Sequence, residues 1–283
     1  MVDSAGGLEV LELAPFKRFP WLVHGLSTRR GGASRPDSGE PVCNLGFAEW
    51  DTREAVVRNR QAFQSALGAS DLTLVPLRQF HSAVVHFFAA APALAAKGDA
   101  AFTSVPGLLL AVQTADCVPI LLVDPKKRAV AAVHAGWRGT LARIAEKTVG
   151  EMRERLRSDP ADLLAAIGPS IGPCCYEVGT ELVTQFASQF AHAEEWFDEL
   201  RTGDEPNPLQ WLNRMPPGHQ PPPKKVRLDL PAVNRAQLLA AGLADNHIFP
   251  SGLCTACHPD LLFSYRKEGQ QSGRLLSVVG IRP

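Results

Sequence analysis

Three short and almost wholly apolar segments in the middle of the chain constrain its fold most strongly. They cover Leu108–Val112, Pro119–Val123 and Ala129–His134, and the turn-forming sequence DPKKR joins the last two. Strands exposed on one face alternate apolar and polar residues, whereas strands covered on both faces read as continuous apolar runs. The three segments are therefore expected to be strands in the interior of the protein.

Other segments predict helices and further strands. Helices are expected from Asp51 or Thr52 to about Leu67, along the stripe Leu141, Ile144, Thr148, Met152 and Leu156, over Val178–Phe190, and in RLDLPAVNRAQLLAAG, which Gly242 would end. Further strands are expected at Leu8–Leu13, Trp21–Ser27, Leu72–Phe80, Val84–Phe88, Leu163–Ile167, FSYR and GRLLSVVGIRP. The chain thus mixes strands and helices along its whole length.

The domain organisation depends on one proline-rich segment. At 283 residues the chain is long enough for one domain or two. The best candidate for a linker is the segment at about 202–225, which is rich in proline and has no apolar period. The piece after it is small and contains few elements. We therefore predict one domain over residues 1–283, with an exposed excursion at about 202–225.

Charge and composition exclude several classes of partner. Lys plus Arg equals Asp plus Glu at 29 each, so no global charge attracts nucleic acid or an anionic membrane. The first 16 residues have neither a basic start nor a continuous apolar stretch, and no run approaches the length of a membrane span. A cytoplasmic location is expected. In that reducing compartment the six cysteines are expected to be thiols or metal ligands.

His81, Cys117 and His134 are the strongest candidates for a functional site. One expected strand, a turn and another strand separate Cys117 from His134, which can bring both to the same edge of a sheet, where His81 can join them. Two imidazoles and one thiolate leave one position of a tetrahedral zinc ion open, which is typical of a catalytic zinc site. The spacing alone also permits three buried residues without a shared partner.

A second group of cysteines offers a rival metal site. Cys254 and Cys257 form a Cys-x-x-Cys pair with His258 adjacent, and Cys174 and Cys175 are neighbours elsewhere in the chain. These residues could form a structural zinc site or a redox pair. A single such pair without a second spaced pair is weak support for either, so the sequence favours ordinary thiols.

Nine motifs between about Gly25 and the C-terminus resemble, in type and order, those of one family: GLSTRRGG, CNLGF, QFHSAVV, GDA, TADCVPILLVD, AAVHAGWRG, IGPSIGPCCYEVG, LDLPAVNRAQL and FSYRKEG. This is the laccase-domain family, formerly labelled multicopper polyphenol oxidase. The resemblance implies an α/β (α+β) fold of mixed sheets sandwiched between helices, similar to the toxin deamidases that use a Cys/His pair. It also implies zinc held by His81, Cys117 and His134.

The same resemblance implies a purine nucleoside phosphorylase. Such an enzyme would convert adenosine, inosine, guanosine or methylthioadenosine and phosphate to the free base and ribose 1-phosphate, with adenosine deamination as a side activity. The expected partners are these small molecules, with no nucleic acid and no membrane, and the sequence does not indicate an oligomeric state.

Phosphorolysis needs a group that holds phosphate. An arginine is expected, because its planar fork matches two oxygens at once. Arg29, Arg138 and Arg266 lie in the motifs, and each could instead form a surface ion pair. We favour Arg266 and Arg138, since both directly follow aromatic residues that could frame a flat base.

Three further polar residues are candidates for proton transfer or substrate binding. Asp116, beside Cys117, is the nearest carboxylate for proton transfer, and its alternative role is an aspartate bonded to the backbone of a turn. Gln79 and Asn44 could read hydrogen-bonding edges of the ribose or the purine. Amides in loops also commonly bond the backbone, so that alternative stays open.

Three other functions compete with the phosphorylase. Cys117 as nucleophile and His134 as base would suit a cysteine-dependent amidase or a hydrolase that edits peptidoglycan precursors. A copper-dependent polyphenol oxidase is disfavoured, because the eight histidines include no His-x-His pair, although a single copper could replace zinc in the trio. The third is a metal-dependent interaction module without catalysis.

Overall fold

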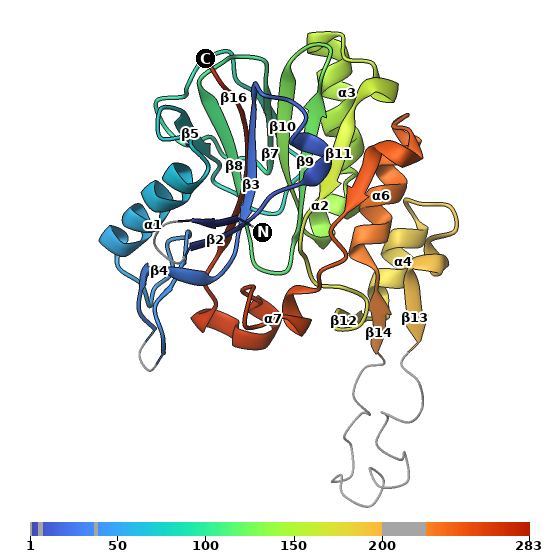
Figure 1. Ribbon diagram of the computed structural model, residues 1–283. Coiled ribbons are helices and arrows are strands. Elements are labelled where there is room, and N and C mark those ends of the chain that lie inside the picture. The colour runs from blue at the N-terminus through green and yellow to red at the C-terminus, as the bar shows by residue number, and fades with distance from the viewer. Residues whose placement is uncertain (1, 5–7, 37–38, 200–224) are drawn as a thin grey trace, which may run out of the picture.

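Two six-stranded mixed sheets lie face to face and are covered by helices on their outer sides (Figure 1). The computed structural model describes residues 2–4, 8–36, 39–199 and 225–283. The predicted fold of mixed sheets and helices is therefore confirmed. The excursion expected at about 202–225 falls, apart from Lys225, outside the described residues.

The first sheet has the C-terminal strand at its centre. Its order is β1–β2–β3–β16–β8–β5, with bounds Val2–Ser4, Leu8–Leu11, Leu22–Ser27, Leu275–Ile281, Leu108–Thr114 and Thr73–Pro76. Neighbouring strands are antiparallel except β5 and β8, which run parallel.

The second sheet contains the two strands next to the candidate trio. Its order is β15–β11–β9–β10–β7–β6, with bounds Ile248–Pro250, Leu164–Ile167, Val118–Asp124, Ala129–Ala135, Ala100–Thr103 and Val85–Phe87. The outer pairs β15–β11 and β7–β6 are parallel, and the inner pairs are antiparallel. A small sheet, β12–β14–β13, covers Glu177–Gly179, Lys225–Leu228 and Phe197–Glu199, and β4 (Arg30–Ser34) bridges to Val42.

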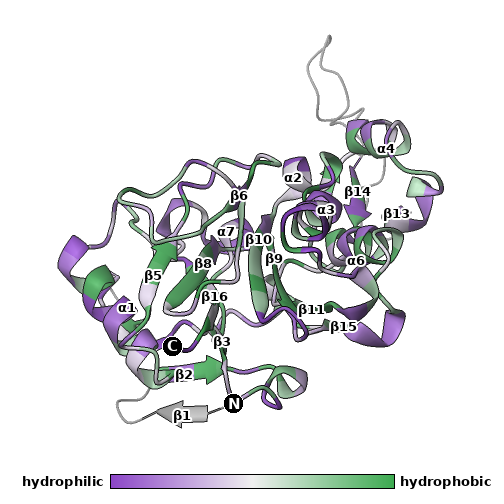
Figure 2. Ribbon diagram, turned by 90° about the horizontal axis from the view of Figure 1, so that it is seen from above, coloured by the Kyte–Doolittle hydropathy of each residue, from purple (hydrophilic) through white to green (hydrophobic). Residues whose placement is uncertain are grey.

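The helices form the outer layers of a four-layer sandwich (Figure 2). The helices are α1 (Arg53–Ala66), α2 (Trp137–Leu141), α3 (Ile144–Leu156), α4 (Glu181–Ala187), α6 (Leu230–Ala240) and α7 (Tyr265–Glu268). Single 3-10 turns cover Ala14–Phe16, Pro160–Asp162, Ala193–Trp196, Asp245–His247, Thr255–Cys257 and Gly269–Gln271. Within the described ranges, no helix combines the length and apolar character needed to cross a membrane.

The apolar interior fills three spaces between these layers. Side chains from the facing sides of the two sheets, such as Leu110, Leu121 and Val130, are fully buried against one another. The other side of the second sheet packs against α3 and α6, and the other side of the first sheet packs against α1. The central strands β8, β9 and β10 are thus buried on both faces, as their continuous apolar sequences predict.

A predicted cap starts helix α1, whereas a break that the sequence does not predict separates α2 from α3. The Thr52 hydroxyl accepts a hydrogen bond from Ala55 N–H and caps α1, close to the predicted start. The single helix expected after His134 is in fact two, because Arg143 adopts a left-handed backbone conformation between α2 and α3.

Three expectations about local structure are wrong. Val178 belongs to β12 rather than to a helix, and α4 covers only Glu181–Ala187. The expected strand at FSYR is the turn of helix α7. The strand expected from Leu72 to Phe80 is β5, which ends at Pro76, because the chain then turns into the loop that carries His81. The last two differences place loop and helix around the candidate site.

Candidate active site

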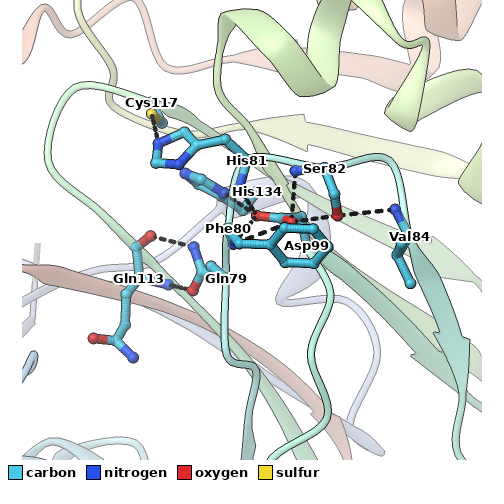
Figure 3. A network of polar contacts seen from close by, with 9 residues as sticks. All are labelled: Gln79, Phe80, His81, Ser82, Val84, Asp99, Gln113, Cys117 and His134. Carbon is cyan, nitrogen blue, oxygen red and sulfur yellow. Dashed lines mark hydrogen bonds and ion pairs between the residues drawn. The ribbon is translucent and has the colours of Figure 1, made fainter.

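The structure brings His81, Cys117 and His134 together at one edge of the second sheet (Figure 3). His134 lies near the end of β10, Cys117 directly precedes β9, and His81 lies in the connection between β5 and β6. Their ligand atoms all lie within 4.8 Å of one another. The Cys117 Sγ to His81 Nε2 distance is 3.8 Å, and the two imidazole centroids are 5.0 Å apart. This His–Cys–His cluster can bind a metal ion.

The Asp99 carboxylate contacts both histidines of the cluster. It lies 2.8 Å from Nδ1 of His134 and accepts hydrogen bonds from the backbone N–H groups of Phe80, His81 and Ser82. The Ser82 hydroxyl donates to it as well, at 2.6 Å. Because Asp99 engages Nδ1, the Nε2 atom of His134 is the one left to face Cys117. A carboxylate behind a ligating histidine fixes the ring and its tautomer in metal sites.

Backbone conformation explains the close approach of the three side chains. His81 has a φ of 61°, a left-handed conformation that few residues other than glycine adopt, and the hydrogen bonds to Asp99 hold it there. Val118 pairs with Ala135 across β9 and β10, so Cys117 lies beside Gly136. A Cβ atom at Gly136 would lie 2.8 Å from His81 Cδ2 and 3.0 Å from Cys117 Sγ. Any larger residue at this position would therefore force at least one of these two side chains to move.

The electrostatics of the cluster favour a thiolate. Burial acts to raise the pKa of Cys117, but His134 and His81 lower it to about 6. Burial acts to lower the pKa of His134, but Cys117 and Asp99 raise it to about 9. Burial also opposes ionisation of Asp99, yet the hydrogen bonds from His134 and Ser82 hold the pKa of its carboxyl well below its ordinary value. Without metal, the lowered pKa of Cys117 and the raised pKa of His134 favour a thiolate beside a protonated imidazole, and a bound metal ion would take the place of that imidazolium proton.

The cluster borders a cavity of about 580 Å³. This volume is typical of small-molecule sites. All three cluster residues line the cavity. The remaining lining comes from the end of β8, from the loops after β5, β8 and β11, and from the segment between β15 and β16, which includes α7: Leu77, Gln79, Gln113, Thr114, Ala115, Asp116, Ile171, Tyr176, Tyr265, Arg266 and Arg274. A metal centre, two tyrosines and two arginines therefore share one space.

One wall of the cavity is built around Asp116 and Arg266. The Asp116 carboxylate accepts hydrogen bonds from the Thr255 hydroxyl and from the backbone N–H of Arg266, both at 2.6 Å. The Arg266 guanidinium donates to the Glu177 carbonyl and lies 5.3 Å from the centroid of the Tyr176 ring. Both oxygens of Asp116 thus bond segments that are distant in the sequence, rather than the backbone of its own turn.

The other sequence candidates lie in different surroundings. Gln79 lines the cavity, but its amide exchanges two 2.7 Å hydrogen bonds with the Gln113 backbone (Figure 3). Asn44 is buried and bonds Gly46, Asp51 and the Arg274 backbone. The Arg29 guanidinium pairs with Glu268, and Arg138 lies exposed over the Trp137 ring. Asn44, Arg29 and Arg138 are not among the residues that line the cavity.

Comparison with known proteins agrees with the sequence motifs. The family described as multi-copper polyphenol oxidoreductase laccase matches residues 23–282. The chain belongs to this family. Among solved structures, the hypothetical protein YfiH of Bacillus licheniformis superimposes with a TM-score of 0.83 at 28% identity, covering 98% of this chain and 97% of that one.

Curated relatives in this laccase family carry nucleoside-processing names. Purine nucleoside phosphorylase YlmD of Geobacillus stearothermophilus is 35% identical over 93% of this chain and 92% of its own length. Purine nucleoside phosphorylase of Deinococcus radiodurans is 38% identical over 94% and 93%. Adenosine deaminase RL5, from an unknown prokaryotic organism, is 40% identical over 64% of this chain and 61% of its own length.

Sequence reasoning missed several residues of this laccase-family site. Asp99 lies in the GDA motif and Tyr176 follows the Cys-Cys pair, so both stood within recognisable motifs. Arg274 comes just before the last strand, with no motif to mark it, and its guanidinium lies over the Tyr265 ring. Only the folded chain brings Asp99, Tyr176 and Arg274 close to the His–Cys–His cluster, because they come from three distant segments.

Proposed function

We propose that this chain is a zinc-dependent purine nucleoside phosphorylase that converts a purine nucleoside and phosphate to the free base and ribose 1-phosphate, with adenosine deamination as a further activity. The observation that carries the proposal is the shared cavity, in which the His–Cys–His cluster faces tyrosines and arginines. The phosphorylase names of two relatives that span nearly the whole chain support the reaction, and the name of a third supports deamination.

Zinc suits the donor set. Two imidazoles and one thiolate are ligands that Zn²⁺ prefers, and a zinc ion held by His81, Cys117 and His134 would keep one coordination position for water or substrate. When bound, such an ion supplies a Lewis acid to a substrate atom. Cu²⁺ would bind the same ligands more tightly if it were available, so copper found in purified protein would not identify the physiological metal.

We assign different roles in phosphorolysis to different residues of the cavity. Phosphate attacks the anomeric carbon while the purine departs, so the site must hold an anion next to a flat base. Arg266 is the proposed phosphate ligand, because this residue lines the cavity and the planar fork of a guanidinium matches two phosphate oxygens. Tyr176 and Tyr265 are proposed to frame the base with their ring faces. Asp116 is proposed to position Arg266 through its backbone.

The test is product analysis with and without phosphate. Purified protein incubated with inosine and phosphate is expected to release hypoxanthine and ribose 1-phosphate, and omission of phosphate is expected to stop release of the base. Cys117→Ala is expected to abolish turnover, whereas Cys43→Ala, which removes a buried thiol outside the cavity, is expected to keep it. Base release that is independent of phosphate would reject phosphorolysis.

One observation favours a second candidate, a cysteine-dependent amidase. Cys117, His134 and Asp99 are arranged as nucleophile, base and orienting carboxylate, with the pKa of the thiol lowered to about 6. The two functions make opposite predictions about chelation. Amide hydrolysis by the thiolate would survive removal of metal, whereas phosphorolysis at the metal centre would not.

A further inference from the structure

A second cluster of metal-binding side chains lies outside the cavity. The four cysteines that the sequence presents as two separate pairs converge, and all four sulfur atoms lie within 4.8 Å of one another. This four-cysteine cluster consists of Cys174, Cys175, Cys254 and Cys257. None of the four is among the residues that line the cavity, so the cluster is separate from the His–Cys–His cluster.

The distances between the sulfur atoms match a tetrahedral metal site. Cys257 Sγ lies 3.4 Å from the sulfur of Cys174 and 3.4 Å from that of Cys175. Four thiolates at the Zn–S distance of about 2.3 Å place their sulfurs about 3.8 Å apart at the corners of a tetrahedron. The observed spacing is close to that edge, and one ion at the centre could contact every sulfur.

Backbone hydrogen bonds hold the two contributing loops together. Ser170 N–H donates to the Leu253 carbonyl at 3.2 Å, and Thr255 N–H donates back to the Ser170 carbonyl at 3.0 Å. Gly172 N–H donates to the Cys254 sulfur at 3.2 Å, a contact that stabilises a thiolate. A Cβ atom at Gly172 would lie 3.3 Å from Cys254 Cβ and 3.4 Å from Cys174 Sγ, so glycine allows this close approach. The cysteines are thus arranged before a metal binds.

We propose that the four-cysteine cluster binds one structural zinc ion. The closed set of four thiolates leaves no position for substrate, which is the pattern of structural rather than catalytic zinc. Binding releases the thiol protons to solvent, and no change of oxidation state is needed. Cys254 is buried while Cys174 and Cys257 are exposed, so an ion can enter from the surface.

The ion would fix one wall of the cavity. Tyr176 directly follows Cys175, and Thr255, between Cys254 and Cys257, donates to the Asp116 carboxylate. Linking the two loops therefore holds Tyr176 and Asp116 at a fixed separation. This consequence for substrate binding rests on the proposed function, whereas the presence of the metal does not.

The first test measures metal in a chain whose catalytic cluster is disabled. His81→Ala/Cys117→Ala removes two ligands of the His–Cys–His cluster and leaves every cysteine of the four-cysteine cluster in place. This variant is expected to retain about one zinc per chain, with an X-ray absorption spectrum of an all-sulfur shell at about 2.3 Å. A chain without bound zinc, a shell that contains nitrogen, or iron in place of zinc would overturn the proposal.

A second variant tests the four-cysteine cluster by a measurement that does not depend on catalysis. Cys257→Ser in the otherwise natural chain is expected to lose about one zinc relative to the wild type, while Cys43→Ala loses none. After denaturation with a chelator and without a reducing agent, the wild-type protein is expected to show all six thiols free. Fewer free thiols, with Cys43 and Cys117 still free, would indicate a disulfide among the four cysteines and would also overturn the proposal. Because these measurements count metal and thiols, their outcome is independent of whether nucleosides are the substrate.

Discussion

The Asp99 carboxylate lies 2.8 Å from Nδ1 of His134 and at the same time accepts the backbone N–H of His81 at 3.0 Å. One carboxylate therefore orients one ligand of the His–Cys–His cluster through its side chain and the other through its main chain. No single local motif contains this relationship, since His81 lies in the loop before β6, Asp99 in the bend that precedes β7, and His134 in β10.

Replacing Asp99 should therefore weaken metal binding. Asp99→Asn puts an NH2 group where donors now converge, so the loop at His81 and the ring of His134 both lose their alignment. Metal affinity measured by chelator competition is expected to fall by roughly 10–100-fold. Asp124 is a matched control, because it is also buried and accepts backbone N–H groups from a turn. Unchanged affinity in Asp99→Asn would contradict the assigned role.

Gly136→Ala should disrupt the cluster by crowding. Its Cβ would approach both His81 and Cys117 to 3.0 Å or less, which forces at least one ligand to move. We expect a loss of about 1–3 kcal/mol in metal binding, seen by calorimetry. Gly150→Ala is the matched glycine control, since nothing lies within 4 Å of its Cβ and it lies inside α3. That change should stabilise the fold by about 1 kcal/mol and leave metal binding unaltered.

The pH dependence of the alkylation rate of Cys117 should reflect the lowered pKa of its thiol. The thiol is protonated below its pKa and reactive above it, so in the metal-free protein the iodoacetamide rate is expected to fall by half near pH 6. An ordinary cysteine would show that midpoint at about pH 8.5. Peptide mass spectrometry separates Cys117 from the other cysteines. Added zinc should protect Cys117 across the whole range, and equal alkylation with and without zinc would argue for the amidase instead.

Two arginines offer a test of phosphate binding. Arg266→Ala removes the guanidinium of a residue that lines the cavity but keeps the backbone N–H that bonds Asp116, so the wall should stay in place. The KM for phosphate is expected to rise about tenfold or more, with a smaller change in the KM for inosine. Arg138→Ala, which removes an exposed arginine beside Trp137, should leave both values near those of the wild type. Equal effects of the two changes would reject Arg266 as the phosphate ligand.

The sequence predicts the elements that leave a local pattern of apolar residues. It does not predict the features that depend on contacts between distant parts of the chain. Continuous apolar runs correctly indicate β8, β9 and β10, because burial on both faces leaves a local signature. The break at Arg143 and the helix at Tyr265–Glu268 carry no such signature. They depend on how neighbouring layers pack, which overrides local preference.

The same distinction holds for the two metal-binding clusters. The strand–turn–strand spacing between Cys117 and His134 predicts their convergence, because β9 and β10 are adjacent antiparallel strands. The four-cysteine cluster has no comparable signal. Its two halves meet only because β11 and β15 lie side by side, although more than 70 residues separate Cys175 from Cys254. Parallel pairing of such distant segments cannot be read from either cysteine pair alone.

The most direct test of the account is phosphorolysis of inosine by metal-depleted protein as zinc is returned. Activity is expected to be absent before the addition, and to return in step with protection of Cys117 from iodoacetamide. Restoration should fail in Cys117→Ala under the same conditions. Full phosphate-dependent turnover in the metal-depleted protein or in Cys117→Ala would contradict a metal centre at the His–Cys–His cluster.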